Sequence, residues 1–493
     1  MTVNIAKIDL DTITKFQEKI HLAADDDEEM VSDFYQEFHK TSWYAHLPVQ
    51  LKSEPGTNGN VTFPVNMTFD YLTYSYMRQR YPALQIKDRF KSRVEISWPH
   101  NLGTNIVERG GLYFDDQDAQ NIDSVWFDIH SQFFMPPGFR DHHNMSVGNI
   151  PILEQWGSYL PAYTTNVDQP WYYGRDTSLA IPILVCSLSK IAHRYTFRDK
   201  ISKLLRMRCK TKEGWRTIKC NLEFIEGHGD DKLPVPELWG RYAYISDEER
   251  EWNKCKTKKV FYIDDIIAID AEDSAPFGRT VSLDLDCETP CRSIFWVAEN
   301  EKALNQNNYS NYTTDHTDLH NGWDPVGPIS LYYGGQPRLD KMATDHFSVA
   351  ECRKHFTSPP SEVGYHGYSF SQNPMSIDAC VGIVMKDLKV KFSAALNDGN
   401  PFLILIKGAS NSNDSDSILL DDEGYMTIGD LSSGQPGSGT SSKDNDITTG
   451  SGRDIGEQKF FLRVRLLVTK KMRIWTAPKE GKKRELFKPM ILQ

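Results

Sequence analysis

The sequence lacks long apolar runs. Its longest apolar stretch, 179–186, is interrupted by Pro182, whereas a membrane-spanning helix needs about 20 apolar residues. The first ten residues also lack the basic segment and following apolar segment that are typical of a secretory signal. We therefore expect neither a membrane-spanning helix nor a secretory signal.

The chain has no excess of positive charge. Its 493 residues include 56 Lys and Arg against 67 Asp and Glu, a formal net charge of −11, whereas nucleic-acid-binding proteins usually carry a basic surplus. The composition therefore argues against sequence-specific nucleic-acid binding.

The segment 457–493 is the exception, with eleven basic and three acidic residues. We interpret it either as a solvated end or as a contact with an acidic partner, which would be a neighbouring protein, anionic lipid or packaged nucleic acid. The residues expected to make this contact, on the inner face of an assembly or between subunits, are Lys470, Lys471, Arg473, Lys482, Lys483 and Arg484.

Cysteine is sparse and shows no disulfide or zinc pattern. Eight cysteines are scattered through the chain without a Cys-x-x-Cys motif, and the closest pair is Cys287 and Cys291, so we expect reduced, mostly buried thiols. Six Asn-x-Ser/Thr motifs occur, and without a signal peptide they are most simply ordinary loop residues. The loop positions at which a glycan could be attached are Asn308, Asn311 and Asn413.

The motifs of common enzyme classes are absent. There is no phosphate-binding Gly-x-x-x-x-Gly-Lys-Ser/Thr loop, no Gly-x-Ser-x-Gly and no His-Glu-x-x-His. Asp141-His-His143 is better interpreted as a polar loop than as a metal site, and His346, Cys352 and His355 lack the second matched pair of a zinc site. The acidic pairs Asp264-Asp265 and Asp421-Asp422 are of the kind that hydrolases use, but solvated turns are the simpler interpretation. We expect no enzyme activity, no cofactor and no metal.

Short alternating segments are abundant, and they predict β-strands. Turn residues such as Pro136-Pro-Gly138 and Gly334-Gly335 separate them, and no alternation of strands with helices is visible. This pattern predicts an all-β fold of antiparallel sandwiches or jelly rolls. The predicted strands are 94–98, 125–129, 260–263, 280–285, 293–297, 402–406 and 461–468.

Helices are expected at two places. Apolar residues at helical spacing predict an N-terminal helix over 5–22, followed by the acidic run Asp25–Glu29. Ser246-Asp-Glu-Glu249 fits a capping box and predicts a short helix over 248–252, almost at the midpoint of the chain.

These signals predict the organisation of the chain. We expect an N-terminal arm or helix over 1–30, a first domain over 31–253 that ends in the short linker helix, and a second domain over 254–493. Within the second domain, 409–456 is rich in Ser, Gly and Asn and predicts a flexible, exposed insertion. Its segments 418–420 and 425–428 could form a small hairpin.

Aromatic residues make up 12% of the chain. They gather in clusters such as Trp171-Tyr172-Tyr173 and Tyr332-Tyr333. Because each aromatic side chain can bury about 150–250 Å², these clusters indicate either barrel cores or subunit contacts in a large assembly.

Four segments, in order, resemble one protein family. They are Gln169-Pro-Trp-Tyr-Tyr-Gly through Leu184, Glu237-Leu-Trp-Gly-Arg-Tyr through Arg250, Arg292-Ser-Ile-Phe-Trp-Val-Ala-Glu-Asn300, and Tyr365-His-Gly-Tyr-Ser-Phe through Pro374. Together they resemble the double jelly-roll major capsid proteins of nucleocytoplasmic large DNA viruses and their smaller relatives. The segments 377–382 and 463–470 depart from the usual family pattern, which bears on the lineage within the family.

The resemblance implies two tandem eight-stranded antiparallel jelly rolls with short helices and long loop insertions. It further implies homotrimeric, pseudo-hexagonal capsomers that tile an icosahedral shell, with minor capsid proteins and an internal membrane as further partners. Such a protein is part of the virion and is assembled in the host cytoplasm.

Two other functions stay open from the sequence. The first is a carbohydrate-binding or carbohydrate-active β-sandwich, in which aromatic clusters stack on sugars and Asp264 or Asp421 supplies a carboxylate. The second is a minor capsid or host-attachment protein, although the length for two barrels favours the major subunit.

Overall fold

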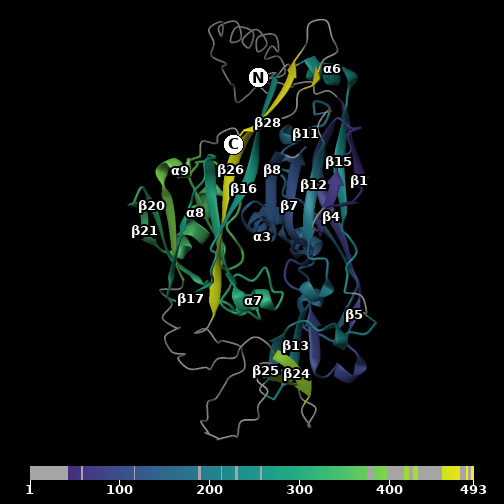
Figure 1. The fold of residues 1–493 in the computed structure, drawn as a ribbon, viewed down its shortest axis with the longest axis vertical. Coiled ribbons are helices and arrows are strands. Elements are labelled where there is room, and N and C mark those ends of the chain that lie inside the picture. Colours follow the sequence, from purple (N-terminus) through teal and green to yellow (C-terminus); the bar gives the residue numbers. More distant parts are fainter. Residues whose placement is uncertain are drawn as a thin grey trace, which may run out of the picture. The chain divides into compact units, whose positions relative to one another are not determined.

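A computed structural model gives the fold of the chain (Figure 1). The structure describes residues 43–56, 59–115, 117–186, 190–212, 214–227, 231–255, 258–374, 382–396, 416–420, 426–430, 458–477, 485–486 and 490–492. Residues Ala45–Gln493 form one compact unit. Within the described ranges, no helix is long and apolar enough to cross a membrane.

The first half of the chain contains two large antiparallel sheets. One follows the order β1 (Tyr44–Gln50), β15 (Glu237–Ile245), β4 (Tyr71–Tyr81) and β10 (Tyr163–Asp168), with β11 (Ile181–Pro182) also on β4. The other follows the order β2 (Glu54–Pro55), β3 (Val61–Pro64), β12 (Ile191–Phe197), β7 (Val107–Phe114) and β8 (Gln117–Asp123).

Smaller elements complete the first half. Two small sheets are β14 (Gly214–Ile218) with β13 (Arg206–Thr211) and β6 (Val94–Ser97), and β5 (Leu84–Gln85) with β9 (Tyr159–Leu160). The α-helices are α2 (Leu102–Asn105), α3 (Ser124–Phe133), α4 (Arg140–Val147), α5 (Pro151–Glu154) and α6 (Asp247–Cys255). Short 3₁₀ turns are η3 (Asp88–Phe90), η4 (Pro137–Phe139), η5 (Tyr172–Gly174), η6 (Thr177–Leu179), η7 (Ile201–Lys203) and η8 (Leu222–Phe224).

The second half repeats the two-sheet arrangement. One sheet is β16 (Lys258–Asp270), β26 (Lys459–Ala477), β19 (Cys291–Asn300) and β22 (His366–Ser369), with β17 (Ala275–Pro276), β27 (Glu485–Leu486) and β28 (Met490–Leu492) along β26. The other is β18 (Thr280–Asp284), β23 (Val390–Leu396), β20 (Val326–Tyr333) and β21 (Gln336–Met342), and β24 (Asp416–Leu420) pairs with β25 (Met426–Asp430). The helices are α7 (Glu301–Asn305), η9 (Leu319–Asn321), the π-helical η10 (His346–Ala350), α8 (Glu351–His355) and α9 (Met385–Leu388).

Burial along the strands follows the sandwich geometry. Residues of β12 and β23 alternate between buried and more exposed positions, because successive side chains of a strand point to opposite faces of its sheet. Each half therefore encloses an apolar core between its two sheets, and the expected all-β fold of two antiparallel halves is confirmed.

Most sequence-predicted elements that lie in the described ranges are confirmed. The segments 94–98, 260–263, 280–285, 293–297 and 461–468 fall on β6, β16, β18, β19 and β26. The predicted hairpin is also present, because β24 and β25 pair antiparallel. The predicted strand 402–406 and the helix 5–22 lie outside the described residues.

The linker helix begins where the capping box predicts. The Ser246 hydroxyl accepts a hydrogen bond from the backbone N–H of Glu249 (3.3 Å), which satisfies one of the unpaired donors of the first helical turn. Arg250 then anchors α6 to the first half through both oxygens of Asp70.

One predicted strand is wrong, because residues 125–129 belong to helix α3. The side chain of Asp123 caps this helix by accepting from the backbone N–H of Trp126 (2.8 Å). All residues of α3 except His130 are buried, so the sequence shows no polar face at helical spacing. The short apolar run therefore resembled a buried strand.

Candidate functional site

Strand β19 is the shared wall between the two halves. All ten of its residues are buried, so both faces of the strand are covered. Ile294, Trp296 and Ala298 belong to the core of the second half, whereas the alternate residues Phe295 and Val297 belong to the core of the first. Because successive side chains of a strand point to opposite faces, β19 contributes to both cores and so joins them.

An aromatic cluster fills the space between α3 and β19. The ring of Phe295 lies 5.8 Å from Trp126, 5.0 Å from Phe133 and 5.1 Å from Phe356, measured between centroids. Phe133 and Phe356 also meet edge to face at 5.3 Å. Aromatic pairs of this kind contribute about 0.5–1.5 kcal/mol each beyond the area that they bury, so this cluster, here called the aromatic seam, holds the halves together.

A buried carboxylate lies on α3 beside the aromatic seam. Asp128 accepts hydrogen bonds from the Tyr312 hydroxyl (2.8 Å) in the second half and from the Asn101 amide (2.7 Å) in the first. Burial raises the pKa of Asp128 to about 6, and these hydrogen bonds limit the increase. The side chain therefore connects one tyrosine and one asparagine from opposite halves.

A glycine lets two segments of the second half pack closely at Tyr312. Gly364 has a φ of +96°, and a Cβ at this position would lie 2.3 Å from the carbonyl oxygen of Tyr312. Both the left-handed conformation and the contact exclude other residues. Gly364 leads into β22, which pairs with β19 from Ser293 to Trp296.

His100 joins the halves through two carboxylates. Its Nδ1 lies 2.7 Å from Glu154 Oε1 in the first half, and its Nε2 lies 3.0 Å from Glu362 Oε1 in the second. Burial alone would lower the pKa of His100, but the charges and hydrogen bonds of Glu362 and Glu154 outweigh it and raise the pKa to about 10. An imidazolium at this position therefore binds both carboxylates at neutral pH.

This bridge predicts a pH dependence of stability. Because the pKa of His100 is higher in the folded chain than its ordinary value of 6.5, its stabilising effect is complete below pH 6.5 and is lost as the pH rises through 10. We expect the free energy of unfolding of the wild type to fall over this range by at most about 1.4 kcal/mol per pH unit from this group, and His100→Asn to remove this part of the slope. Denaturant titrations at pH 6, 8 and 9.5 measure it.

The matched control for this prediction is His142→Asn. His142 is exposed on α4, so its replacement should keep the slope of the wild type. Equal slopes for the wild type and His100→Asn would contradict the ion-pair bridge.

Arg465 connects the two halves at the centre of β26. Its guanidinium lies 2.5 Å from Asp123 Oδ2, in the first half, and 2.6 Å from Asp270 Oδ1, on β16. Only 2% of the Arg465 side chain is exposed. Burial disfavours its charge, but the two carboxylates outweigh burial and hold its pKa above the ordinary value. Since Asp123 also caps α3, one carboxylate both starts this helix and holds the neighbouring half.

Two adjacent carboxylates of β16 are also paired. Asp264 binds Arg175 of the first half (2.8 Å) and the fully buried Arg292, and Asp265 binds Lys470 of β26 (2.6 Å). Both aspartates are buried, so the interpretation of this pair as a solvated turn is wrong. Their side chains leave the strand in opposite directions and are each neutralised by a cation, which does not fit a pair of catalytic carboxylates facing one cleft.

The structure describes three of the predicted basic contact residues. Lys470 is buried in the ion pair with Asp265, so within this chain it stabilises the pairing of β16 and β26. Lys471 lies over the Tyr262 ring at 5.7 Å. Arg473 is described only through its backbone in β26, and Lys482, Lys483 and Arg484 lie outside the described residues.

Two of the three candidate glycan positions are buried. Asn308 is 2% and Asn311 1% exposed. Their amides donate to the carbonyl oxygens of His316 (3.1 Å) and Asp315 (2.6 Å), so neither side chain has room for a glycan. The third position, Asn413, lies outside the described residues.

The interpretation of Asp141 to His143 as a polar loop is wrong, because these residues lie on helix α4. Cys352 lies on α8, and its thiol donates to the carbonyl oxygen of Phe347. No group of three His, Cys, Asp or Glu with the arrangement of a metal site occurs among the described residues.

Sequence reasoning missed most of this interface. The contacts of Asp128, His100 and Glu362 join residues that lie up to 262 positions apart, so no local spacing marks them. A local signal did exist for α3, because Asp123 stands three residues before Trp126 and fits a helix cap.

Two protein-family models match this chain. One is described as the major capsid protein N-terminus and matches residues 32–246. The other is described as the large eukaryotic DNA virus major capsid protein and matches residues 255–382. The first match ends directly before α6, and the second begins at the last residue of this helix.

Curated relatives and solved structures agree with these families. The major capsid protein of Invertebrate iridescent virus 3 is 24% identical, and the match covers 80% of this chain and 91% of that relative. The major capsid protein of Lymphocystis disease virus 1 (isolate Darai) is 26% identical, and the match covers 76% of this chain and 84% of that relative. The fold is similar to a quasi-atomic model of the PBCV-1 virus capsid (TM-score 0.63, 12% identity, 92% and 99% coverage). It is also similar to the Faustovirus major capsid protein (TM-score 0.62, 7% identity, 90% and 92% coverage).

Proposed function

The chain belongs to the major capsid proteins of large eukaryotic DNA viruses, and from this premise we propose that three copies assemble into a pseudo-hexagonal capsomer. It is a structural, non-enzymatic protein of the virion, where copies of it build the icosahedral capsid shell. The fold is the double jelly roll of that family. The trimer is the next level of this assembly.

The observation that best supports the proposed trimer is the fixed pairing of the two jelly rolls. The aromatic seam, the His100 bridge and Arg465 hold them as one unit. Three such units around a threefold axis present six barrels, and each copy offers the same pair of faces to its neighbours. Barrels that moved independently could not tile a regular shell.

We further propose the domain organisation that the sequence predicts. It consists of an arm over 1–30, a first jelly roll over 31–253, and a second over 254–493 with an exposed insertion over 409–456. Helix α6 between the two sets of sheets supports this division. Of the insertion, the structure describes only β24 and β25.

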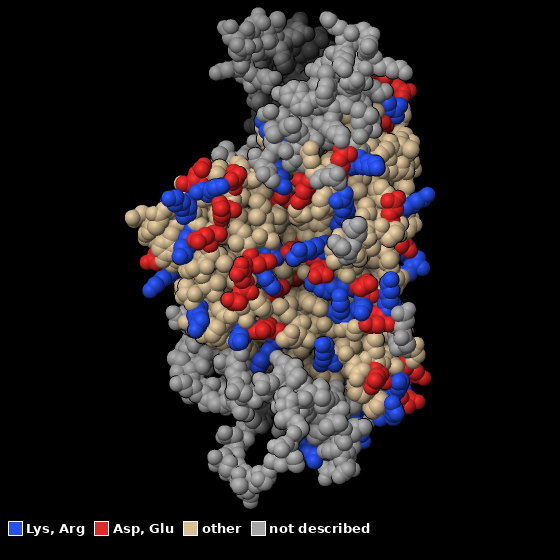
Figure 2. All heavy atoms as spheres, in the orientation of Figure 1, with Lys and Arg blue, Asp and Glu red and all other residues tan. Residues whose placement is uncertain are grey.

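The remaining partners are also proposals. Minor capsid proteins and an internal membrane are expected from the family, as is assembly in the host cytoplasm. The basic residues Lys471, Arg473, Lys482, Lys483 and Arg484 are proposed to contact an acidic partner. Figure 2 shows Lys and Arg interleaved with Asp and Glu on the visible face, which favours contacts at selected points over binding to a polyanion along this whole face.

The proposal is tested on the purified chain. We expect light scattering to give three times the chain mass of 56.5 kDa, and negative-stain images to show particles of near-hexagonal outline. The control is a chain with Trp126→Ala and Phe295→Ala, which should lose the hexagonal outline because its barrels are no longer fixed. A wild-type chain that stays monomeric at high concentration would refute the trimer.

A further inference from the structure

The two jelly rolls repeat one arrangement of strands. In each roll, one sheet places the first strand beside the last long strand, followed by two strands from the middle of the roll: β1, β15, β4 and β10, or β16, β26, β19 and β22. The other sheet ends with β8 or β21, and a helical segment follows that strand, either α3 or residues 346–355 of η10 and α8. Each surface of one roll therefore has a counterpart in the other.

Within the chain, the helix of the first roll covers the outer face of a sheet of the second. Trp126 and Phe133 of α3 contact Phe295 on β19, and Asp123, which caps α3, binds Arg465. Arg465 lies beside Phe295 on the adjacent strand β26, because the two residues pair in register. A helix with a carboxylate at its start thus meets an aromatic ring beside an arginine.

The first roll has the same two residue types on its matching strands. Tyr74 on β4 pairs in register with Arg241 on β15. The rings of Tyr76 and Trp239 extend this outer face, stacked with 6.3 Å between their centroids. The three rings are half-buried and Arg241 is exposed, whereas the matching ring and arginine of the second roll are buried. These residues, here called the aromatic strip, form the surface that corresponds to the one α3 covers.

The second roll exposes the matching helical segment. Val349 of η10 is 52% exposed, and Arg353 of α8 is exposed as well, whereas α3 is buried at all residues but one. Asp345 lies at the N-cap of η10, where Asp123 lies in α3, and its side chain is exposed and makes no capping hydrogen bond. Among the described residues, no ion pair joins either Asp345 or Arg241 to a partner of opposite charge.

The helical segment and the aromatic strip lie on different sides of the chain. Figure 1 shows α8, β20 and β21 on one side, and β4 and β15 on the other. The two surfaces therefore cannot meet within one copy, but they can meet between two copies.

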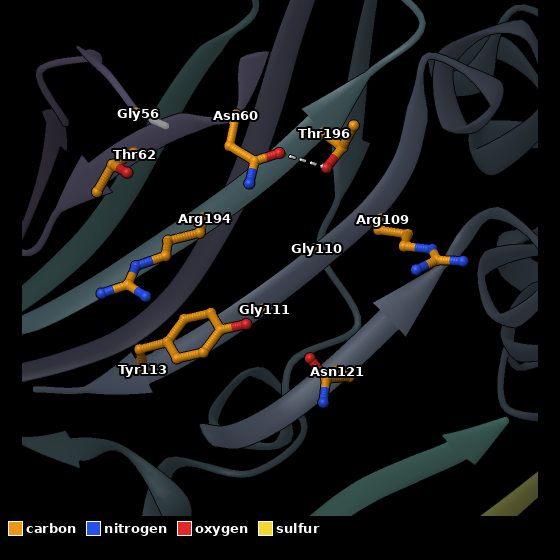
Figure 3. Close-up of a pocket in the computed structure, with 10 residues that line it drawn as sticks. All are labelled: Gly56, Asn60, Thr62, Arg109, Gly110, Gly111, Tyr113, Asn121, Arg194 and Thr196. Atoms are coloured by element: carbon orange, nitrogen blue, oxygen red, sulfur yellow. Dashed lines mark hydrogen bonds between the residues drawn. The ribbon is translucent and has the colours of Figure 1, made fainter. Parts of the chain in front are cut away.

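The outer face of the other sheet of the first roll suits this helix less well. Figure 3 shows a groove along β3, β7, β8 and β12 that is lined by polar side chains such as Asn60, Thr62, Asn121 and Thr196. The Thr196 hydroxyl donates to Asn60 (2.7 Å), and burying such groups under an apolar side chain such as Val349 would remove their contact with water. The aromatic strip is the better surface for the helix.

We propose that the aromatic strip binds residues 345–355 of a neighbouring copy of the chain, with an ion pair between Arg241 and Asp345 of the neighbouring copy. This contact repeats between copies the junction that joins the two rolls within a copy, where Arg465 binds Asp123. A heterologous contact closes into a ring when its rotation fits, and alternating junctions within and between three copies close a pseudo-hexagon. The inference rests on the proposed function, because assembly supplies the neighbouring copy.

Charge reversal in the full-length chain tests this contact. R241E and D345R each place two like charges opposite one another in every contact between copies. We expect the concentration at which half of the chains are trimers to rise at least about tenfold for each variant, because like charges in an interface repel. R241E/D345R restores opposite charges and should return this concentration to within about threefold of the wild type. Light scattering on a dilution series measures it.

K190E is the matched control. Lys190 is exposed directly before β12, in the other sheet of the first roll, and K190E makes the same change of charge as R241E. It should assemble as the wild type does. Because all of these changes affect exposed side chains, each variant should keep the circular dichroism spectrum of the folded chain, and the recovery of R241E/D345R shows independently that the single variants do not fail by misfolding.

The proposal is overturned if R241E or D345R assembles as readily as the wild type, if R241E/D345R assembles no better than the single variants, or if K190E is impaired as much as R241E. Any of these results with a trimeric wild type refutes this contact alone and leaves the capsomer standing. A wild-type chain that forms no trimers refutes the capsomer, and the contact with it.

Discussion

Arg465→Met will lower the free energy of unfolding by about 3–5 kcal/mol, because it leaves Asp123 and Asp270 in a buried site without their cation. The methionine occupies a similar volume, so the loss reports charge more than packing. Asp123 also caps α3, and the change therefore loosens the helix that carries the aromatic seam. Denaturant titration at pH 7, followed by tryptophan fluorescence, measures the effect.

Two variants isolate the cause of this loss. Arg80→Met breaks an exposed ion pair with Glu237 at 3.3 Å and should cost at most about 1 kcal/mol. Adding Asp123→Asn and Asp270→Asn to Arg465→Met should restore part of the lost stability, because the uncompensated charges are gone. An Arg465→Met chain as stable as Arg80→Met would show that the buried ion pairs are not needed.

Phe295→Ala will uncouple the two jelly rolls. Removing this fully buried ring costs about 3–5 kcal/mol for a large core side chain. It also removes the ring contacts to Trp126, Phe133 and Phe356 that make up the aromatic seam. We expect calorimetry to resolve two unfolding transitions in the variant where the wild type has one.

Phe392→Ala is the matched control for this change. Phe392 is equally buried but lies in the core of the second jelly roll alone, so its loss should lower stability without splitting the transition. If Phe295→Ala keeps a single transition at a lower temperature, the seam is ordinary core and does not couple the barrels.

Local patterns predicted the strands well, because alternation reflects two faces with different surroundings. Segment 280–285 is an example, because exposed and half-buried residues alternate along β18. The same reasoning failed at α3, where burial on nearly all sides removed the contrast between faces. The family resemblance also predicted the double jelly roll, from motifs that lie mostly on β15, β19 and β22.

The roles of charged and polar residues were harder to predict. Lys470 and Asn308 belong to residue types that are mostly exposed, but both are buried by partners that only the fold supplies. Asp264 and Asp265 are likewise neutralised by cations from distant segments. Local spacing does not reveal such pairs, because most of them form only when segments that are distant in the sequence meet in the folded chain.

The position of Phe295 has a consequence for synthesis on the ribosome. The first jelly roll emerges complete with α6, but Phe356, which also covers α3, follows about 100 residues later, or roughly 5–20 s at common translation rates. During that time the rings of α3 lack the contact of Phe356 and, at first, that of Phe295. The nascent chain therefore exposes apolar side chains of α3 that could aggregate with other copies being synthesised. For the same reason, we expect the first half alone to be a poor separate domain. A chimaera that combines the first half of one viral capsid protein with the second half of another should fold only if the aromatic rings of the two halves still fit each other across the seam.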